Sequence, residues 1–97
     1  GRPVVVDDEQ AIVRALTAAL EARGYQVIVA QTGQDALERT ATFGPDLILL
    51  DIGLPDIDGL EVLRTIRRTC DVFVVLVTAR ADEVDTLVGL RTGADDY

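Results

Sequence analysis

Short apolar runs alternate along this chain with longer segments in which apolar residues recur at helical spacing. Uninterrupted apolar runs predict four β-strands, at Val4–Val6, Gln26–Ala30, Leu47–Leu50 and Phe73–Val77. Apolar residues three or four positions apart predict four helices, at about 9–23, 33–42, 60–68 and 82–91. The predicted order is therefore β-α-β-α-β-α-β-α.

The strands are apolar at nearly every position instead of alternating between apolar and polar residues. Such strands are typical of a sheet that is covered on both faces, so we expect one α/β domain, residues 1–97, with a parallel sheet between two helix layers. On the third helix, Arg64, Arg67 and Arg68 are expected on the exposed side, near the negative end of the helix dipole.

The fourth predicted strand, Phe73–Val77, is among the most apolar, so we expect it to lie inside the sheet with a neighbour on each side. A fifth strand would begin near Tyr97, the last residue given. We therefore expect that this sequence stops short of a complete domain, or that another chain supplies the missing edge.

The composition narrows the possible functions. Nine basic residues, all Arg, face seventeen acidic ones, and the formal net charge is −8. Such a chain repels phosphate backbones, so it is not expected to bind nucleic acid by itself. It has no His, a single Cys70, no apolar run long enough to cross a bilayer and no signal-peptide pattern. We expect a cytoplasmic domain without membrane contact.

Acidic residues follow two of the predicted strands directly. Asp7 and Asp8 come after the first strand and Asp51 after the third, while Thr78 follows the fourth. Ligands of open parallel sheets bind beyond the carboxyl ends of the strands, so these side chains are expected to converge. Carboxylates held close together repel unless a cation lies among them, and hard oxygen ligands favour Mg²⁺.

Four segments carry a resemblance to a known family: VVVDDE at Val4–Glu9, DIGLPDIDG at Asp51–Gly59, VTAR at Val77–Arg80 and GADDY at Gly93–Tyr97. In this order and spacing they resemble the receiver domain of bacterial two-component response regulators. The resemblance implies a flavodoxin-like three-layer fold with strand order 2-1-3-4-5. It also implies that the last strand, a lysine and the final helix of that fold are absent from this sequence.

The resemblance implies a role for each matching residue at the strand ends. Asp51 would be the phosphoryl acceptor, Asp8 would ligate Mg²⁺ directly, and Asp7 would help to hold the ion. Gly53 would offer its backbone carbonyl to the metal. A carboxylate is a workable nucleophile for phosphoryl transfer once its charge is screened.

Two further roles and the biological setting also follow from the resemblance. Thr78 would donate a hydrogen bond to the phosphoryl group, and Tyr97 would be the aromatic that moves on activation. The implied function is a signalling switch and not an enzyme: a sensor histidine kinase donates the phosphoryl group, and the complete protein forms a homodimer on activation. TARADEVDTLVGLRTGADDY resembles regulators with a winged-helix output domain, so DNA would be bound only through a part not present here.

Other interpretations stay open from the residues alone. Asp7 and Asp8 could cap the first helix, Asp51 could be a turn residue, Thr78 could cap a helix, and Tyr97 could simply pack. For the whole chain, the alternative is a receiver-like interaction or dimerisation module that is never phosphorylated. A phosphohydrolase is disfavoured, because such enzymes usually place a second acid where Gly53 stands.

Overall fold

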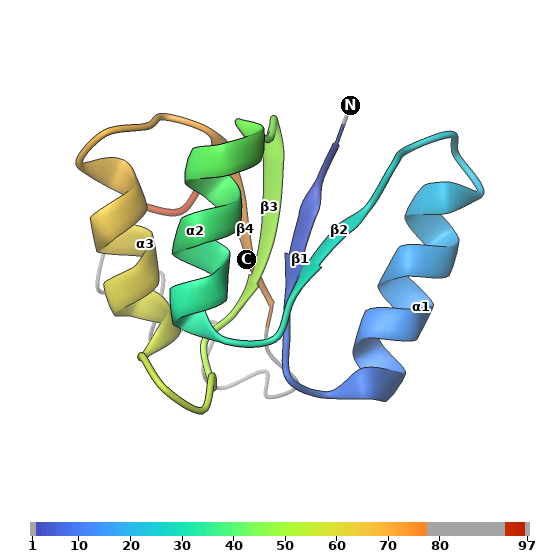
Figure 1. Ribbon diagram of the computed structural model, residues 1–97, viewed down its shortest axis with the longest axis horizontal. Helices are drawn as coiled ribbons and strands as arrows, with labels where there is room; N and C mark the ends of the chain where they lie inside the picture. The colour runs from blue at the N-terminus through green and yellow to red at the C-terminus, as the bar shows by residue number, and fades with distance from the viewer. Residues whose placement is uncertain (1, 78–92, 97) are drawn as a thin grey trace.

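The computed structural model describes residues 2–77 and 93–96. Figure 1 shows a sheet with helices packed on both of its sides. In chain order the elements are β1 (Val4–Val6), α1 (Gln10–Glu21), β2 (Ile28–Ala30), α2 (Gly33–Phe43), β3 (Leu47–Asp51), α3 (Gly59–Arg67) and β4 (Phe73–Val77). The four predicted strands and the first three predicted helices are confirmed. The fourth predicted helix, at 82–91, lies outside the described residues.

The four strands form one parallel sheet in the order β2-β1-β3-β4. In the register of the sheet, Val5 lies opposite Val29 on one side and opposite Leu49 on the other. Leu49 in turn lies opposite Val75 of β4. The doubly wound parallel sheet that the apolar strands predicted is therefore confirmed.

The main core lies between the sheet and the two helices α2 and α3, on the left in Figure 1. Alternate strand residues point into it, because successive side chains of a strand face opposite sides. Its fully or almost fully buried members from the strands are Val4, Val6, Ala30, Ile48, Leu50, Val74 and Leu76, and those from the helices are Ala36, Val62, Leu63 and Ile66.

The other face of the sheet is covered less evenly. Helix α1 packs on this face against β1, whose three residues are all buried. Along β3 and β4, however, burial alternates, and Phe73 is 49% exposed. Helices therefore lie on both faces of the sheet, as predicted, but in the described part of the chain this face is only partly covered along β3 and β4. The physical reason is that α1 lies beside β1, and one helix covers only the strands nearest to it.

Strand β4 has a neighbour on each side. Besides β3, the segment 93–96 lies alongside it through a parallel bridge between Val75 and Asp96. The backbone N–H of Asp95 donates to the carbonyl of Val74 at 2.9 Å, and the N–H of Leu76 donates to the carbonyl of Asp96 at 3.0 Å. The interior position that the apolar sequence of β4 predicted is confirmed.

The three arginines at the end of α3 do not share one exposed side. Arg64 and Arg68 are exposed, and Arg64 pairs with Glu61 one turn earlier. The side chain of Arg67 is only 23% exposed, since its guanidinium group is turned toward the start of β4 and the segment 93–96. The expectation that Arg67 lies on the exposed side is therefore wrong. None of the described helices is long and apolar enough to span a bilayer.

Candidate functional site

The acidic residues singled out by the sequence meet where β1 and β3 end. These strands are neighbours in the sheet, and Val6 of β1 lies opposite Leu50 of β3. Because the strands are parallel, the next residue of each, Asp7 and Asp51, emerges at the same edge of the sheet. The backbone N–H of Asp7 still donates to the carbonyl of Ala30 in β2 at 3.1 Å, which holds it in line with the sheet.

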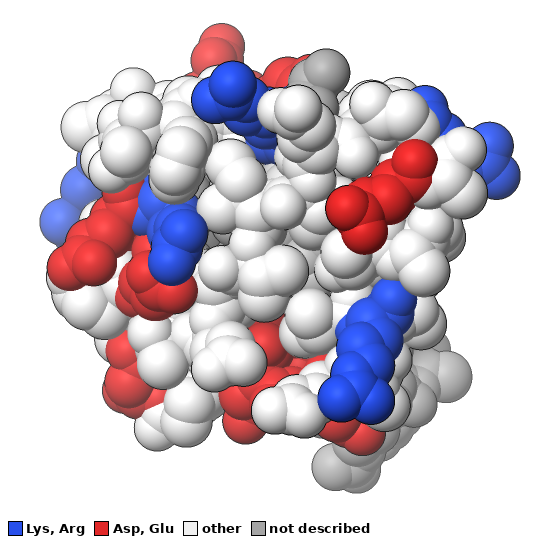
Figure 2. Space-filling model, turned by 45° about the vertical axis from the view of Figure 1, so that its right-hand side comes forward, with Lys and Arg blue, Asp and Glu red and all other residues white. Residues whose placement is uncertain are grey.

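Asp7, Asp8 and Asp51 form a compact group of carboxylates. Each can offer one oxygen such that the three oxygens lie within 4.8 Å of one another. Asp7 is only 3% exposed, Asp51 is half-buried and Asp8 is exposed, so the group opens to solvent on one side. In Figure 2 acidic side chains gather at the lower end of the molecule, where β1 and β3 end in Figure 1.

Burial and mutual repulsion disfavour the charged forms of these acids. Burial raises the pKa of Asp7 above its ordinary value, and repulsion from Asp8 and Glu9 raises it further, against the hydrogen bond from the Glu9 N–H. Burial likewise raises the pKa of Asp51, as does repulsion from Asp7 and Asp8, while the Gly53 N–H opposes the shift. A cation among the three oxygens would relieve this repulsion.

Local hydrogen bonds fix two of the three carboxylates. Oδ1 of Asp7 accepts the backbone N–H of Glu9 at 2.8 Å. Oδ1 of Asp51 accepts the N–H of Gly53 at 3.2 Å. This bond is compatible with the alternative interpretation of Asp51 as a turn residue. The N-cap of α1 is Glu9, and no side chain caps that helix. Neither Asp7 nor Asp8 is therefore the N-cap residue of the first helix, although Asp7 accepts the N–H of Glu9 just before it.

The donor set suits Mg²⁺. Three carboxylates supply hard oxygen atoms, which Mg²⁺ prefers as ligands. The pKa values of Asp7 and Asp51 are raised, and a bound cation would lower them again. One side of the group is open for water or substrate. Gly53 is exposed in the loop that follows Asp51, and the use of its carbonyl as a metal ligand stays a prediction. Thr78 and Tyr97 lie outside the described residues, so their predicted roles stay predictions as well.

No role was predicted for Asp56, which lies in the same loop as Gly53. Its carboxylate accepts the backbone N–H groups of Gly33 at 2.7 Å and of Gln34 at 3.0 Å, at the start of α2. The hydrogen bonds from Gln34 and Gly33 lower the pKa of Asp56 below its ordinary value. The partners precede Asp56 by 22 and 23 residues, so no local sequence pattern could have indicated this contact.

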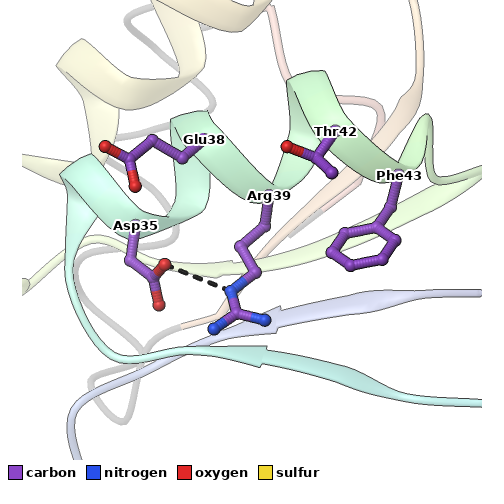
Figure 3. Close-up of a pocket in the computed structure, with 5 residues that line it drawn as sticks. All are labelled: Asp35, Glu38, Arg39, Thr42 and Phe43. Atoms are coloured by element: carbon purple, nitrogen blue, oxygen red, sulfur yellow. Dashed lines mark hydrogen bonds and ion pairs between the residues drawn. The ribbon is translucent and has the colours of Figure 1, made fainter.

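A concave area lies on the outer side of α2 and is lined by Asp35, Glu38, Arg39, Thr42 and Phe43 (Figure 3). Nε of Arg39 pairs with Oδ1 of Asp35 at 3.1 Å, one turn apart on the same helix. The pocket shares no residue with the acidic group and is built from a single helix surface. Asp7, Asp8 and Asp51 therefore remain the candidate site.

Comparison with known proteins agrees with this geometry. The sequence model of the family described as "Response regulator receiver domain" matches residues 4–97. Among similar proteins, the KDP operon transcriptional regulatory protein KdpE of Escherichia coli is 49% identical over 94 residues. The transcriptional regulatory protein AfsQ1 of Streptomyces coelicolor is 47% identical over 94 residues. Each match covers 97% of this chain and 42% of the relative, so the chain spans less than half the length of these proteins.

Solved structures of response regulators are also similar to this chain. The BeF3-activated N-terminal receiver domain of Klebsiella pneumoniae RstA superimposes with a TM-score of 0.91 at 33% identity, over 100% of this chain and 83% of that one. The response regulator protein TrrA of Thermotoga maritima, solved in complex with Mg²⁺ and BeF, gives 0.87 at 37% identity, over 99% and 83%. Both likenesses extend over almost the whole of this chain.

Proposed function

This chain belongs to the response regulator receiver domain family, and from that premise we propose that it is a phosphorylation-dependent switch whose phosphoryl acceptor is Asp51. The observation that carries the proposal is the meeting of Asp51 with Asp7 and Asp8 at the carboxyl edge of the sheet, with ligand oxygens within 4.8 Å. A structural carboxylate would not need two like-charged neighbours at this distance.

The proposed reaction uses the Asp51 carboxylate as nucleophile. One of its oxygens forms a bond to the phosphorus of a phosphohistidine, and the P–N bond breaks with its electron pair passing to the histidine nitrogen. The product is an aspartyl phosphate on Asp51 and a free histidine on the donor. When bound by Asp7, Asp8 and Asp51, Mg²⁺ supplies the positive charge that screens the attacking carboxylate from the incoming phosphate.

The residues around Asp51 support this role. Its hydrogen bond from the Gly53 N–H holds one carboxylate oxygen, and its partial exposure leaves room for a donor to approach. In the product, the phosphoryl group adds close to two negative charges beside Asp7 and Asp8. We propose that Thr78 then donates a hydrogen bond to this group, and that Tyr97 moves in response.

The similar proteins suggest which molecule donates the phosphoryl group and which process the chain regulates. The similar proteins are transcriptional regulatory proteins, so we propose that a sensor histidine kinase phosphorylates this chain and that the output is transcription. DNA would be bound by a further part of the protein, because the −8 charge of this chain opposes binding to a phosphate backbone. Homodimerisation on activation belongs to the same proposal.

The decisive experiment is intact mass spectrometry after incubation with acetyl phosphate and Mg²⁺. We expect one phosphoryl group on the chain, lost in Asp51→Asn and lost when EDTA removes the metal. The matched control is Asp46→Asn, which neutralises an exposed aspartate just before the start of the same strand. This control should be modified like the wild type.

A form that continues past Tyr97 serves as a second sample, because the family resemblance puts a phosphate-contacting lysine there. A larger extent of modification in the longer form would measure what that lysine contributes. If neither form gains mass while both are folded, the phosphoacceptor proposal fails. The non-phosphorylated interaction module would then be the better description of this chain.

A further inference from the structure

The loop that follows Asp51, residues 52–58, is closed tightly at its base. The backbone N–H of Gly59 donates to the carbonyl of Ile52 at 3.1 Å. A Cβ atom at Gly59 would overlap the carbonyl oxygen of Asp51 and would lie 2.5 Å from Cα of Ile52. The end of the loop therefore packs directly on the backbone of the proposed acceptor.

The far side of the same loop is attached to α2. Asp56 accepts hydrogen bonds from the N–H groups of Gly33 and Gln34, the first two residues of that helix. These groups have no partner within the helix, and the positive end of the helix dipole favours a carboxylate there. The hydrogen bonds from Gln34 and Gly33 lower the pKa of Asp56, because they stabilise its charged form.

The contact is close as well as polar. A Cβ atom at Gly33 would lie 2.9 Å from Cβ of Ile57 and 2.9 Å from Cγ2 of Val62. Only glycine at this position lets the start of α2 approach the loop and α3 so closely. The loop is thus fixed at two points, at Gly59 by its own backbone and at Asp56 by a different element of the fold.

Helix α2 also has a cap of its own. Oγ1 of Thr32 accepts the N–H of Asp35 at 3.0 Å, which is the usual N-cap bond. The helix therefore does not depend on Asp56 alone for its first turn. Since Asp56 stands in the loop and not in the helix, its two hydrogen bonds restrict the loop.

We propose that Asp56 is a positioning residue that ties the acceptor loop to α2 and so keeps Gly53 and the Asp51 carboxylate in the geometry that binds Mg²⁺. This inference rests on the proposed function of Asp51. Without these hydrogen bonds, the loop samples more conformations. The apparent affinity for Mg²⁺ then falls in proportion to the fraction of molecules whose loop is in the conformation that binds the metal.

The test compares Asp56→Ala with Thr32→Ala. Both variants remove a bond to the first turn of α2, but only Asp56→Ala releases the loop. We measure the Mg²⁺ concentration that gives half-maximal phosphorylation by acetyl phosphate. Asp56→Ala should raise this Mg²⁺ concentration about three- to tenfold, which corresponds to the loss of ordinary hydrogen bonds. Asp56→Asn keeps an acceptor oxygen and should raise the concentration less. Thr32→Ala should leave it within about twofold of the wild type.

Mg²⁺ binding is followed in parallel by amide chemical shifts of Gly53, with no phosphoryl donor present. This readout separates the two proposals, because it remains valid if the wild type is never phosphorylated. A rise in the Mg²⁺ dissociation constant that is specific to Asp56→Ala supports the tie. Equal effects of Asp56→Ala and Thr32→Ala, or no effect of Asp56→Ala, would overturn it.

Discussion

The guanidinium group of Arg67, at the end of α3, lies 2.7 Å from Oδ2 of Asp95, and that same oxygen accepts the backbone N–H of Val74 at 2.8 Å. Arg67 also donates to the carbonyls of Val72 at 2.6 Å and Gly93 at 3.0 Å. One side chain thus joins α3, the start of β4 and the segment that lies along the outer edge of β4.

This arrangement predicts that Arg67→Ala destabilises the fold. The substitution leaves the carbonyl of Val72 and the carboxylate of Asp95 without their strongest donor, and such losses cost about 1–3 kcal/mol. Arg67→Lys keeps the charge but loses the planar fork, so it should recover only part of the loss. Urea denaturation followed by circular dichroism measures both changes.

Arg68→Ala is the matched control for this measurement. Arg68 is the next residue and is exposed, so its removal should change the free energy of unfolding by no more than about 0.5 kcal/mol. Equal stability of the Arg67 and Arg68 variants would show that the contacts of Arg67 contribute nothing.

Gly59→Ala should be severe although it adds a single methyl group. The added Cβ would overlap the backbone of Asp51 and Ile52, which cannot move without disturbing the end of β3. We expect a loss of at least about 1–3 kcal/mol in the free energy of unfolding, as for other overpacked sites, and impaired Mg²⁺ binding. Thermal unfolding and a Mg²⁺ titration are the measurements.

Gly53→Ala provides the contrast within the same loop. A Cβ atom there would meet only the Asp51 carboxylate oxygens, at 3.9 and 4.0 Å, which is ordinary contact. Its φ angle is not positive, so alanine should be accepted with little loss of stability. A Gly53 variant as unstable as the Gly59 variant would contradict the packing argument.

Asp51→Asn should stabilise the protein in the absence of metal. The substitution removes one of three clustered negative charges. Burial of Asp51 and repulsion from Asp7 and Asp8 disfavour this charge, as the raised pKa of Asp51 indicates. In the presence of Mg²⁺ the order should reverse, since the wild type gains about 2.7 kcal/mol at a metal concentration 100-fold above its dissociation constant. Thermal unfolding in EDTA and in Mg²⁺ tests both statements, with Asp46→Asn as the control that should show neither effect.

The same raised pKa sets a pH dependence. The folded protein holds a proton on Asp51 more tightly than the unfolded chain, in which an Asp titrates near 3.8. Lowering the pH through the raised pKa therefore favours the folded state at this group. In EDTA, the stability advantage of Asp51→Asn should shrink as the pH falls from neutral toward 3.8. An advantage that stays constant over this range would mean that the Asp51 charge is not the cause.

Thr32→Ala should lower the stability by about 1 kcal/mol, the usual effect of losing an N-cap side chain. The bond that disappears runs from the Asp35 N–H to Oγ1 of Thr32. Thr42→Ala is the control, because Thr42 is exposed near the other end of α2 and alanine is the better helix former. A Thr32 variant as stable as the Thr42 variant would show that the two hydrogen bonds that Asp56 accepts suffice for this helix end.

The sequence by itself determined the described strands and helices and the meeting of the three acidic residues. Apolar runs such as Phe73–Val77 specify strands because they can bury both of their sides, and Thr32 before a periodic segment marks a helix start. The proximity of Asp7, Asp8 and Asp51 could be predicted from the sequence, because residues that follow parallel strands emerge at one edge of the sheet. These features are local or depend on a simple topological rule.

Only the tertiary structure decided which polar groups meet across long sequence distances. Asp56 bonds to Gly33 and Gln34, and Arg67 bonds to Asp95, 28 residues away, although neither pattern is visible in the chain. The uneven cover of β3 and β4 likewise depends on where α1 packs. Periodicity specifies which side of an element is apolar, but the neighbour of an individual side chain is set by the relative placement of whole elements, which arises from the packing of the complete core.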